Sequence, residues 1–135
     1  PFQNMLAFDE IAIEAIVPAP KGIPNGGYLK LERRVGDFAT AGVAVAVESS
    51  QGLIIRAGIG LTGVGGSTIN ATAAAQSLVG APLTAGSIAH AADLAAQAAQ
   101  PRSDHRGSAS YKRQIVKTFV VRILNGVVES IERAA

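Results

Sequence analysis

Residues 28–35 combine an aromatic ring with alternating charges, a pattern suited to recognition of a planar ligand. If this stretch is a strand, successive side chains point to opposite faces. The polar face then carries Tyr28, Lys30, Glu32 and Arg34. The apolar face carries Leu29, Leu31 and Val35, with Arg33 as its one charge. An amphipathic ring among charges can pack on a planar ligand or a partner subunit, or it can pack as an ordinary surface residue.

Two other stretches invite a chemical interpretation. Gly36-Asp37 indicates a turn in which the Asp37 carboxylate caps its own backbone. Residues 58–63 match the G-x-G-x-x-G pattern, which in a dinucleotide-binding fold follows a strand and has an acid about 20 residues further on. Here the glycines lie inside a predicted strand, and the next acid after Glu48 is Asp93. We interpret them as the bare face of a strand that a helix or neighbouring backbone approaches closely.

The remaining polar signals favour structural roles. Residues 63–68 lead into a predicted helix whose amino terminus could receive an anion, but a flexible connector accounts for the glycines as well. His105 has no serine or acid partner at the spacing of a catalytic triad, and His90 lies between alanines as a packed or surface histidine. Asp104 precedes a predicted helix, where a carboxylate is stabilising. The sequence therefore predicts no catalytic residue and no metal site.

The composition of the 135-residue chain excludes several classes of function. Cysteine is absent, which rules out disulfides and thiolate ligation of zinc or iron–sulfur clusters by this chain. Lys and Arg exceed Asp and Glu by 12 to 10 and are dispersed, which gives no indication of nucleic-acid binding. No apolar run approaches the ~20 residues that span a bilayer. The start at Pro1 is not that of a signal peptide, and we expect a chain cut from a longer polypeptide or processed.

Alternation of apolar and polar residues predicts four strands. They cover residues 10–17, 28–35, 40–47 and 53–62. The first has one apolar face, made of Ile11, Ile13, Ala15 and Val17. A loop at 18–27 follows it, and a hairpin turn at 49–52 joins the last two strands. The last strand aligns Ile55, Ile59 and Leu61. An antiparallel meander is the simplest topology.

After residue 62 the period changes to that of helices, which are predicted at about 69–79, 85–100 and 108–133. The first has an apolar face of Ala71, Ala74, Ala75, Leu78 and Val79. Small residues in the second suggest close packing against a neighbour. The third has a long apolar stripe and Ser108 as its cap, with Lys112 largely off the stripe. Strands first and helices afterwards predict one α+β domain over residues 1–135. Its antiparallel three- to four-stranded sheet, about 10–62, is covered on one face by a three-helix bundle, about 68–133.

The chain resembles the carboxy-terminal domain of the FAD subunit of molybdenum-containing hydroxylases. This family includes aerobic carbon monoxide dehydrogenase and the xanthine dehydrogenase relatives. The motif is Tyr28, Lys30, Arg33-Arg34, Gly36-Asp37, Phe38 and Ala39-Thr40-Ala41. Two further segments match in order, Ile59-Gly60-Leu61-Thr62 and residues 104–108 with Tyr111-Lys112-Arg113 following. The resemblance spans nearly the whole chain and implies the same fold.

The resemblance also implies a role in a cytoplasmic oxidoreductase. Tyr28 would sit against the isoalloxazine ring of FAD, Lys30 would lie nearby, and Asp37 would hold the turn in shape. FAD would be bound mainly by a separate amino-terminal domain, and molybdopterin and iron–sulfur clusters would lie in the large and small partner subunits. The domain itself would close over the flavin and contribute no acid, base or nucleophile. The alternative from another class is a cofactor-free protein-interaction module that uses the polar face of residues 28–35.

Overall fold

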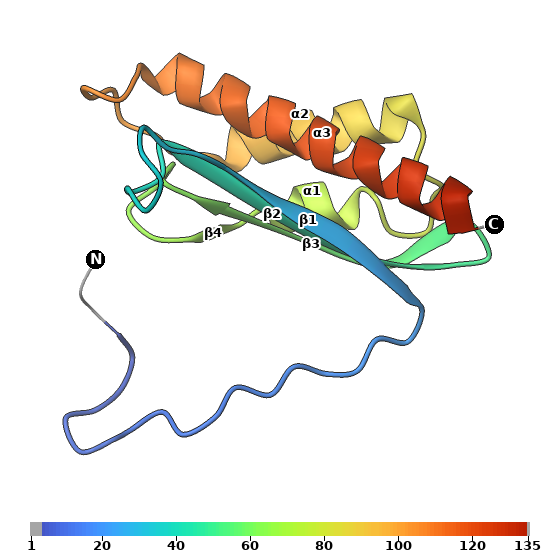
Figure 1. Ribbon diagram of the computed structural model, residues 1–135, viewed down its shortest axis with the longest axis horizontal. Helices are drawn as coiled ribbons and strands as arrows, with labels where there is room; N and C mark the ends of the chain where they lie inside the picture. The colour runs from blue at the N-terminus through green and yellow to red at the C-terminus, as the bar shows by residue number, and fades with distance from the viewer. Residues whose placement is uncertain (1–3, 135) are drawn as a thin grey trace.

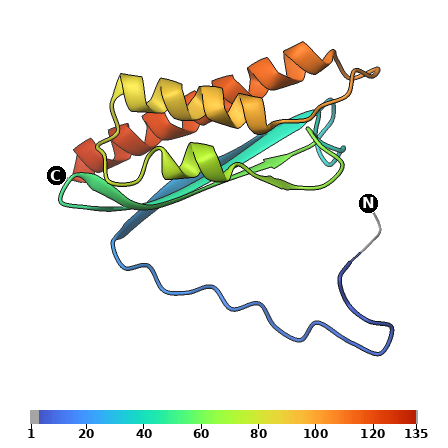
Figure 2. The ribbon, with the colours of Figure 1, turned by 180° about the vertical axis from the view of Figure 1, so that it is seen from behind.

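A four-stranded antiparallel sheet with helices on one face forms the core of the computed structural model, which describes residues 4–134. The strands run in the order β1-β2-β3-β4, with bounds Ile23–Leu31, Ala41–Ser50, Leu53–Thr62 and Ile69–Asn70. The helices are α1 (Thr72–Gln76), α2 (Ala85–Ala98) and α3 (Ala109–Ala134). Figures 1 and 2 show all three helices on the same side of the sheet. The predicted α+β meander with helices on one face is therefore confirmed.

The two faces of the sheet differ in the size and burial of their side chains, as β2 shows. On β2, the side chains that face the helices are fully or almost fully buried: Val43, Val45 and Val47. The residues between them, Ala44 and Ala46, are exposed on the other face. Register carries this alternation to the neighbouring strands, because Val43 pairs with Leu29 on β1 and with Leu61 on β3. Valine suits the buried positions because its branched side chain packs well on a pleated surface.

A β-bulge changes which isoleucine of β3 is buried. The register shifts between Glu48 and Ser49, so that Glu48 pairs with Arg56 while Ser49 pairs with Ile54. Ile54 is buried and Ile55 is exposed. The prediction that Ile55 shares the core face with Ile59 was therefore wrong, since the extra residue lets Ile54 take that place.

The first predicted strand is not part of this sheet. Residues 10–17 carry no regular secondary structure and their side chains are exposed. The sheet begins instead with β1, which starts within the predicted loop and ends at Leu31. Residues 32–35 form part of the connection to β2, and Val35, predicted on the apolar face, is fully exposed. β1 starts as early as Ile23 because β2 is long enough to pair with it there, since β2 continues to Ser50.

The helix predicted over residues 69–79 is shorter than expected. Ile69 and Asn70 pair with the end of β3 as β4, and only Thr72–Gln76 are helical. The predicted core face is correct for the residues Ala71, Ala74, Ala75 and Leu78, whereas Val79 is exposed. Its N-cap is Ala71, and no side chain caps it.

The two longer helices match their predicted positions and faces. α2 begins with a capping box between Thr84 and Ser87, and its buried alanines support the expected close packing. In α3, Ser108 Oγ accepts a hydrogen bond from the Tyr111 N–H at 3.2 Å, as expected of a cap. The predicted stripe is buried or packed against the core, as Ile115, Val116, Phe119, Val120, Ile123, Leu124, Val127, Val128 and Ile131. None of the described helices is both long and apolar enough to cross a membrane.

Candidate functional site

The face of the sheet away from the helices, here called the open face, is lined by very small residues. Its central positions are Gly42, Ala44, Ala46, Gly58 and Gly60. No atom lies within 4 Å of a Cβ built on Gly58 or Gly60. The expectation that a helix or neighbouring backbone approaches closely was therefore wrong for Gly58 and Gly60, because the helices cover the opposite face. It was correct for Gly63, where a Cβ would lie 2.6 Å from the Ala39 carbonyl oxygen. Gly58 and Gly60 do lie within β3, as predicted, and not at a strand-to-helix turn, while Gly63 directly follows the strand.

Tyr28 lies on the open face, as its alternation predicted. Its cross-strand partner is Ala44, and the side chain is 55% exposed. The ring lies beside Gly42, where a Cβ would approach the Tyr28 hydroxyl oxygen to 3.1 Å and the Thr62 methyl carbon to 2.7 Å. Gly42 thus leaves space for the ring against the sheet. The arrangement presents an aromatic surface on a flat background of glycine and alanine, which suits contact with a planar group.

Lys30 lies two residues further along the same face and is held in place by charge. It forms an ion pair with Glu32, and its Nζ donates a hydrogen bond to the backbone carbonyl of Asp37 at 3.3 Å. The hydrogen bond that the Lys30 ammonium donates to the Glu32 carboxylate is the main cause that raises the pKa of Lys30, so the ammonium is charged at neutral pH. The structure therefore brings Lys30 to Asp37, while Tyr28 lies further along the same face.

Asp37 shapes the turn between β1 and β2, as predicted. The Asp37 N–H donates to the Arg34 carbonyl at 3.0 Å, and the Asp37 Oδ1 accepts from the Phe38 N–H at 2.8 Å. Gly36 has a φ of 87°, a left-handed conformation that glycine adopts without strain. The carboxylate thus satisfies its own turn and fixes the start of the path into β2.

An arginine from a distant motif completes this turn. Arg106 Nη2 lies 3.4 Å from Asp37 Oδ1, and its Nη1 donates to the Phe38 carbonyl at 3.4 Å. The Arg106 guanidinium carbon is 5.9 Å from the centroid of the exposed Phe38 ring, within cation–π range. Two of the segments that carried the resemblance, at 36–38 and 104–107, therefore meet in space at one end of the sheet.

The loop that carries Arg106 and leads into α3, here called the Arg106 loop, is itself held in place by a buried lysine. Lys112 is almost fully buried, contrary to its predicted position off the apolar stripe, and its Nζ donates to Asp104 Oδ2 at 2.7 Å and to the Arg102 carbonyl at 2.9 Å. The Lys112 hydrogen bond is the main cause that lowers the pKa of Asp104. Asp104 Oδ1 also accepts from the Arg106 N–H at 2.8 Å. This pairing explains how a charge can be buried at the start of α3.

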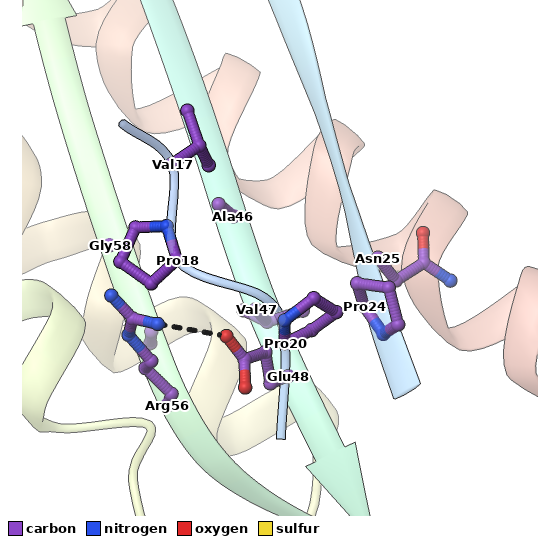
Figure 3. A pocket seen from close by; sticks show the side chains of 11 residues that line it. Val17, Pro18, Pro20, Pro24, Asn25, Ala46, Val47, Glu48, Arg56 and Gly58 are labelled. Carbon is purple, nitrogen blue, oxygen red and sulfur yellow. Dashed lines mark hydrogen bonds and ion pairs between the residues drawn. The ribbon is translucent and has the colours of Figure 1, made fainter. Parts of the chain in front are cut away.

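A second feature lies at the other end of the open face. A hollow of about 380 Å³ is bounded by Val17, Pro18 and Pro20 on one side and by β1, β2 and β3 on the other. Figure 3 shows Arg56 reaching across to Glu48 below this segment. Arg56 Nη1 donates to Glu48 Oε1 at 3.1 Å, and the Lys21 N–H donates to Glu48 Oε2 at 2.9 Å. The hydrogen bond from Lys21 is the main cause that lowers the pKa of Glu48.

The other predicted signals do not gather into a site. His90 and His105 are exposed, on α2 and on the Arg106 loop respectively. Within residues 4–134, no three His, Asp or Glu side chains come together in a way that could hold a metal ion. The glycine-rich stretch at 63–68 leads into β4 rather than directly into a helix, which removes the helix terminus on which an anion site depended.

An α+β domain with its helices on one face of the sheet and an exposed aromatic ring on the other face is the class that this geometry defines. Residues 27–127 match the family described as the CO dehydrogenase flavoprotein C-terminal domain, and the chain belongs to this family. The resemblance inferred from the sequence motifs is thereby confirmed.

Individual relatives agree with this assignment. The chain is 33% identical over 124 residues to the carbon monoxide dehydrogenase medium chain of Hydrogenophaga pseudoflava, covering 92% of this chain and 43% of that protein. It is 36% identical over 106 residues to the medium chain of Afipia carboxidovorans, covering 78% and 37%. A solved structure of the Hydrogenophaga pseudoflava carbon monoxide dehydrogenase lacking the Mo-pyranopterin moiety superposes with a TM-score of 0.76 at 38% identity, covering 81% and 38%. The chain thus spans less than half the length of these relatives.

Sequence reasoning missed four residues that shape the open face and its ends. Arg106 was noted only as a motif residue, because nothing in the sequence indicates that it meets Asp37. Gly42 lies in a strand of small residues, and the sequence does not indicate that the Tyr28 ring lies beside it. Glu48 and Arg56 pair only through the β-bulge, which alternation does not reveal. Opposite charges near a predicted hairpin were the one available signal for that pair.

Proposed function

We propose that this chain is the carboxy-terminal domain of the FAD-containing medium subunit of a cytoplasmic molybdenum hydroxylase of the carbon monoxide dehydrogenase type. Its partners are an upstream FAD-binding domain, an iron–sulfur small subunit and a molybdenum large subunit. When bound, FAD supplies redox chemistry that passes electrons from the iron–sulfur clusters to an acceptor. The domain's role is to form one wall of the flavin site.

The observation that carries this proposal is the position of the Tyr28 ring on the open face, with glycine and alanine at the neighbouring positions of β2 and β3. The cross-strand neighbour Ala44 is too small to shield the ring, and Gly42 leaves space for it against the sheet. A planar, partly apolar ring system such as isoalloxazine fits a surface of this shape. The residues present therefore fit the cofactor that the family implies.

Each candidate residue has a role that needs no proton transfer. Tyr28 packs on the ring and excludes water from one side of it. Lys30 supplies a positive charge near the same face while remaining tied to Glu32 and to the Asp37 carbonyl. Asp37 and Arg106 keep the turn at the end of the face in one conformation. The domain thus contributes shape and electrostatics rather than a catalytic acid, base or nucleophile.

The test uses the complete medium subunit, with the flavin-binding portion upstream of this chain. Its absorption spectrum should contain a flavin band after purification. The Tyr28→Ala variant should change flavin fluorescence and the rate of flavin reduction, with little effect on melting temperature, because an exposed ring contributes little to the core. Tyr111→Ala is the matched control, since Tyr111 is 50% exposed at the start of α3.

Two outcomes would contradict the proposal. A complete subunit without a flavin band would leave the open face as the docking surface of a cofactor-free interaction module. Equal effects of the Tyr28 and Tyr111 substitutions on flavin fluorescence would remove Tyr28 from the flavin site, even if the subunit binds flavin elsewhere.

A further inference from the structure

Residues 10–17 have the side-chain pattern of a strand but no strand partner within the described residues. None of the backbone groups of residues 11–17 takes part in a hydrogen bond there. Ile13 is 89% exposed and Ile16 is 80% exposed, and Ile11 and Val17 are similarly open. An unpaired, alternating apolar segment offers both a backbone edge and an apolar face to another sheet.

The point at which this segment leaves the sheet is fixed by specific contacts. The two Glu48 carboxylate oxygens accept from the Lys21 N–H and from Arg56, as described above. Gly22 packs so tightly against β2 that a Cβ would lie 2.6 Å from the Ser49 carbonyl oxygen. The contacts of Glu48 with Lys21 and Arg56, here called the Glu48 anchor, therefore hold the point where the segment leaves the sheet. The fold thus sets the direction in which the segment leaves.

That direction is away from the free edge of this chain's own sheet. Val17, Pro18 and Pro20 border the hollow over β2, β3 and the start of β1, so the segment crosses the open face instead of running along the free edge of β1 (Figure 3). Both prolines lack an N–H and cannot extend a ladder. Figures 1 and 2 show the preceding residues drawn out on the side opposite the helices. A hairpin between residues 10–17 and β1 is thus disfavoured by the anchor.

We propose that residues 10–17 form a strand in a sheet of the upstream flavin-binding portion of the same polypeptide. This inference rests on the proposed function, which supplies that portion. Two observations select it as the occupant: the matched family region begins only at residue 27, and the chain covers 43% of a medium-chain relative. The added strand places Ile11 and Ile13 in the core of the upstream portion, with its backbone hydrogen-bonded to an edge strand there.

The consequence is a rigid connection between two parts of the subunit. The linker consists only of residues 18–20. The proposed strand fixes one end of this linker, and the Glu48 anchor fixes the other. The two parts cannot then rotate freely about the linker. The open face is held toward the portion to which the strand belongs, which is the geometry that a shared site needs.

Amide hydrogen exchange in the complete subunit tests the inference, with this 135-residue chain as the reference. Residues 11–17 should exchange at least about 100-fold more slowly in the complete subunit, since hydrogen-bonded strand amides exchange only through opening. Ile13→Asp in the complete subunit should lower the melting temperature and abolish the protection. Ile16→Asp is the matched control, because Ile16 lies on the face of Glu10 and Glu14 and should retain the protection.

The outcomes separate this inference from the proposed function. A subunit that binds flavin while residues 11–17 exchange as fast as in the shorter chain would overturn the strand and leave the flavin role intact. Protection without a flavin band would support the strand while the flavin role fails. Equal loss of protection in the Ile13 and Ile16 variants would also overturn the proposed burial of one face.

Discussion

The two faces of one sheet differ in every property that decides their role. The face toward the helices is built from branched side chains such as Val45 and Leu61, which are buried by α1, α2 and α3. The open face is built from glycine and alanine and carries the exposed ring of Tyr28. Glycine in a strand costs stability and provides nothing to pack, so folding alone does not explain Gly58 and Gly60, which have open space above them. The difference teaches that one face stabilises the domain while the other is shaped for contact.

The largest effect should come from placing the same charge on each face. Val45→Asp buries an unpaired carboxylate in the core and should unfold the chain or cost several kcal/mol, on the order of 3 or more. Ala44→Asp, the preceding residue on the open face, should stay within about 0.5 kcal/mol of the parent. Urea unfolding followed by circular dichroism measures both. Similar losses for the two variants would break the distinction between the faces.

A smaller effect should separate two glycines of the open face. Gly42→Ala places a methyl group against the Tyr28 hydroxyl and the Thr62 methyl, and should cost about 1 kcal/mol because the ring must shift. Gly60→Ala meets nothing within 4 Å and should be neutral or stabilise the chain by roughly 0.5–1 kcal/mol. Thermal unfolding gives the stabilities, and near-ultraviolet circular dichroism reports the ring. A Gly60 variant less stable than the Gly42 variant would contradict the view that Tyr28 occupies the space over Gly42.

The smallest effect concerns the Glu48 anchor and is identified by how the stability of the fold depends on pH. Because the Lys21 and Arg56 hydrogen bonds lower the Glu48 pKa in the folded state, the carboxylate stabilises the fold at pH values above its ordinary pKa of 4.5. That contribution is lost as the pH falls through the lower folded pKa. Glu48→Gln should therefore be less stable than the parent at pH 7, and the difference should disappear in acid. A difference that is the same at both pH values would assign the anchor to packing rather than charge.

Much of the fold can be predicted from the spacing of apolar residues, because burial of one face of a helix or strand determines that spacing. The stripe of α3 and the buried valines of β2 were predictable, since one buried face requires apolar residues at the repeat of the element. Periodicity does not identify partners, however. It indicated a strand at residues 10–17 without revealing that no partner lies in this chain's sheet. It also could not find the bulge that replaces Ile55 by Ile54.

The candidate site was predictable only in part for the same reason. Alternation placed Tyr28 and Lys30 together on one face, and the Gly36-Asp37 pair predicted the capped turn. The contact between Asp37 and Arg106 joins residues 69 apart in the sequence, and no local pattern specifies it. Burial of Lys112 likewise depends on the Asp104 carboxylate and the Arg102 carbonyl, which come into place only when the loop folds onto α3.

The most direct test of the contact role of the open face is chemical modification of the two tyrosines, read by peptide mass spectrometry. In this chain Tyr28 and Tyr111 are 55% and 50% exposed, so tetranitromethane should nitrate them at comparable rates. In the complete flavin-loaded subunit, Tyr28 should be protected at least about tenfold relative to Tyr111, because burial of the ring removes access to the reagent. Nitration of both tyrosines at comparable rates in the complete subunit would contradict the account.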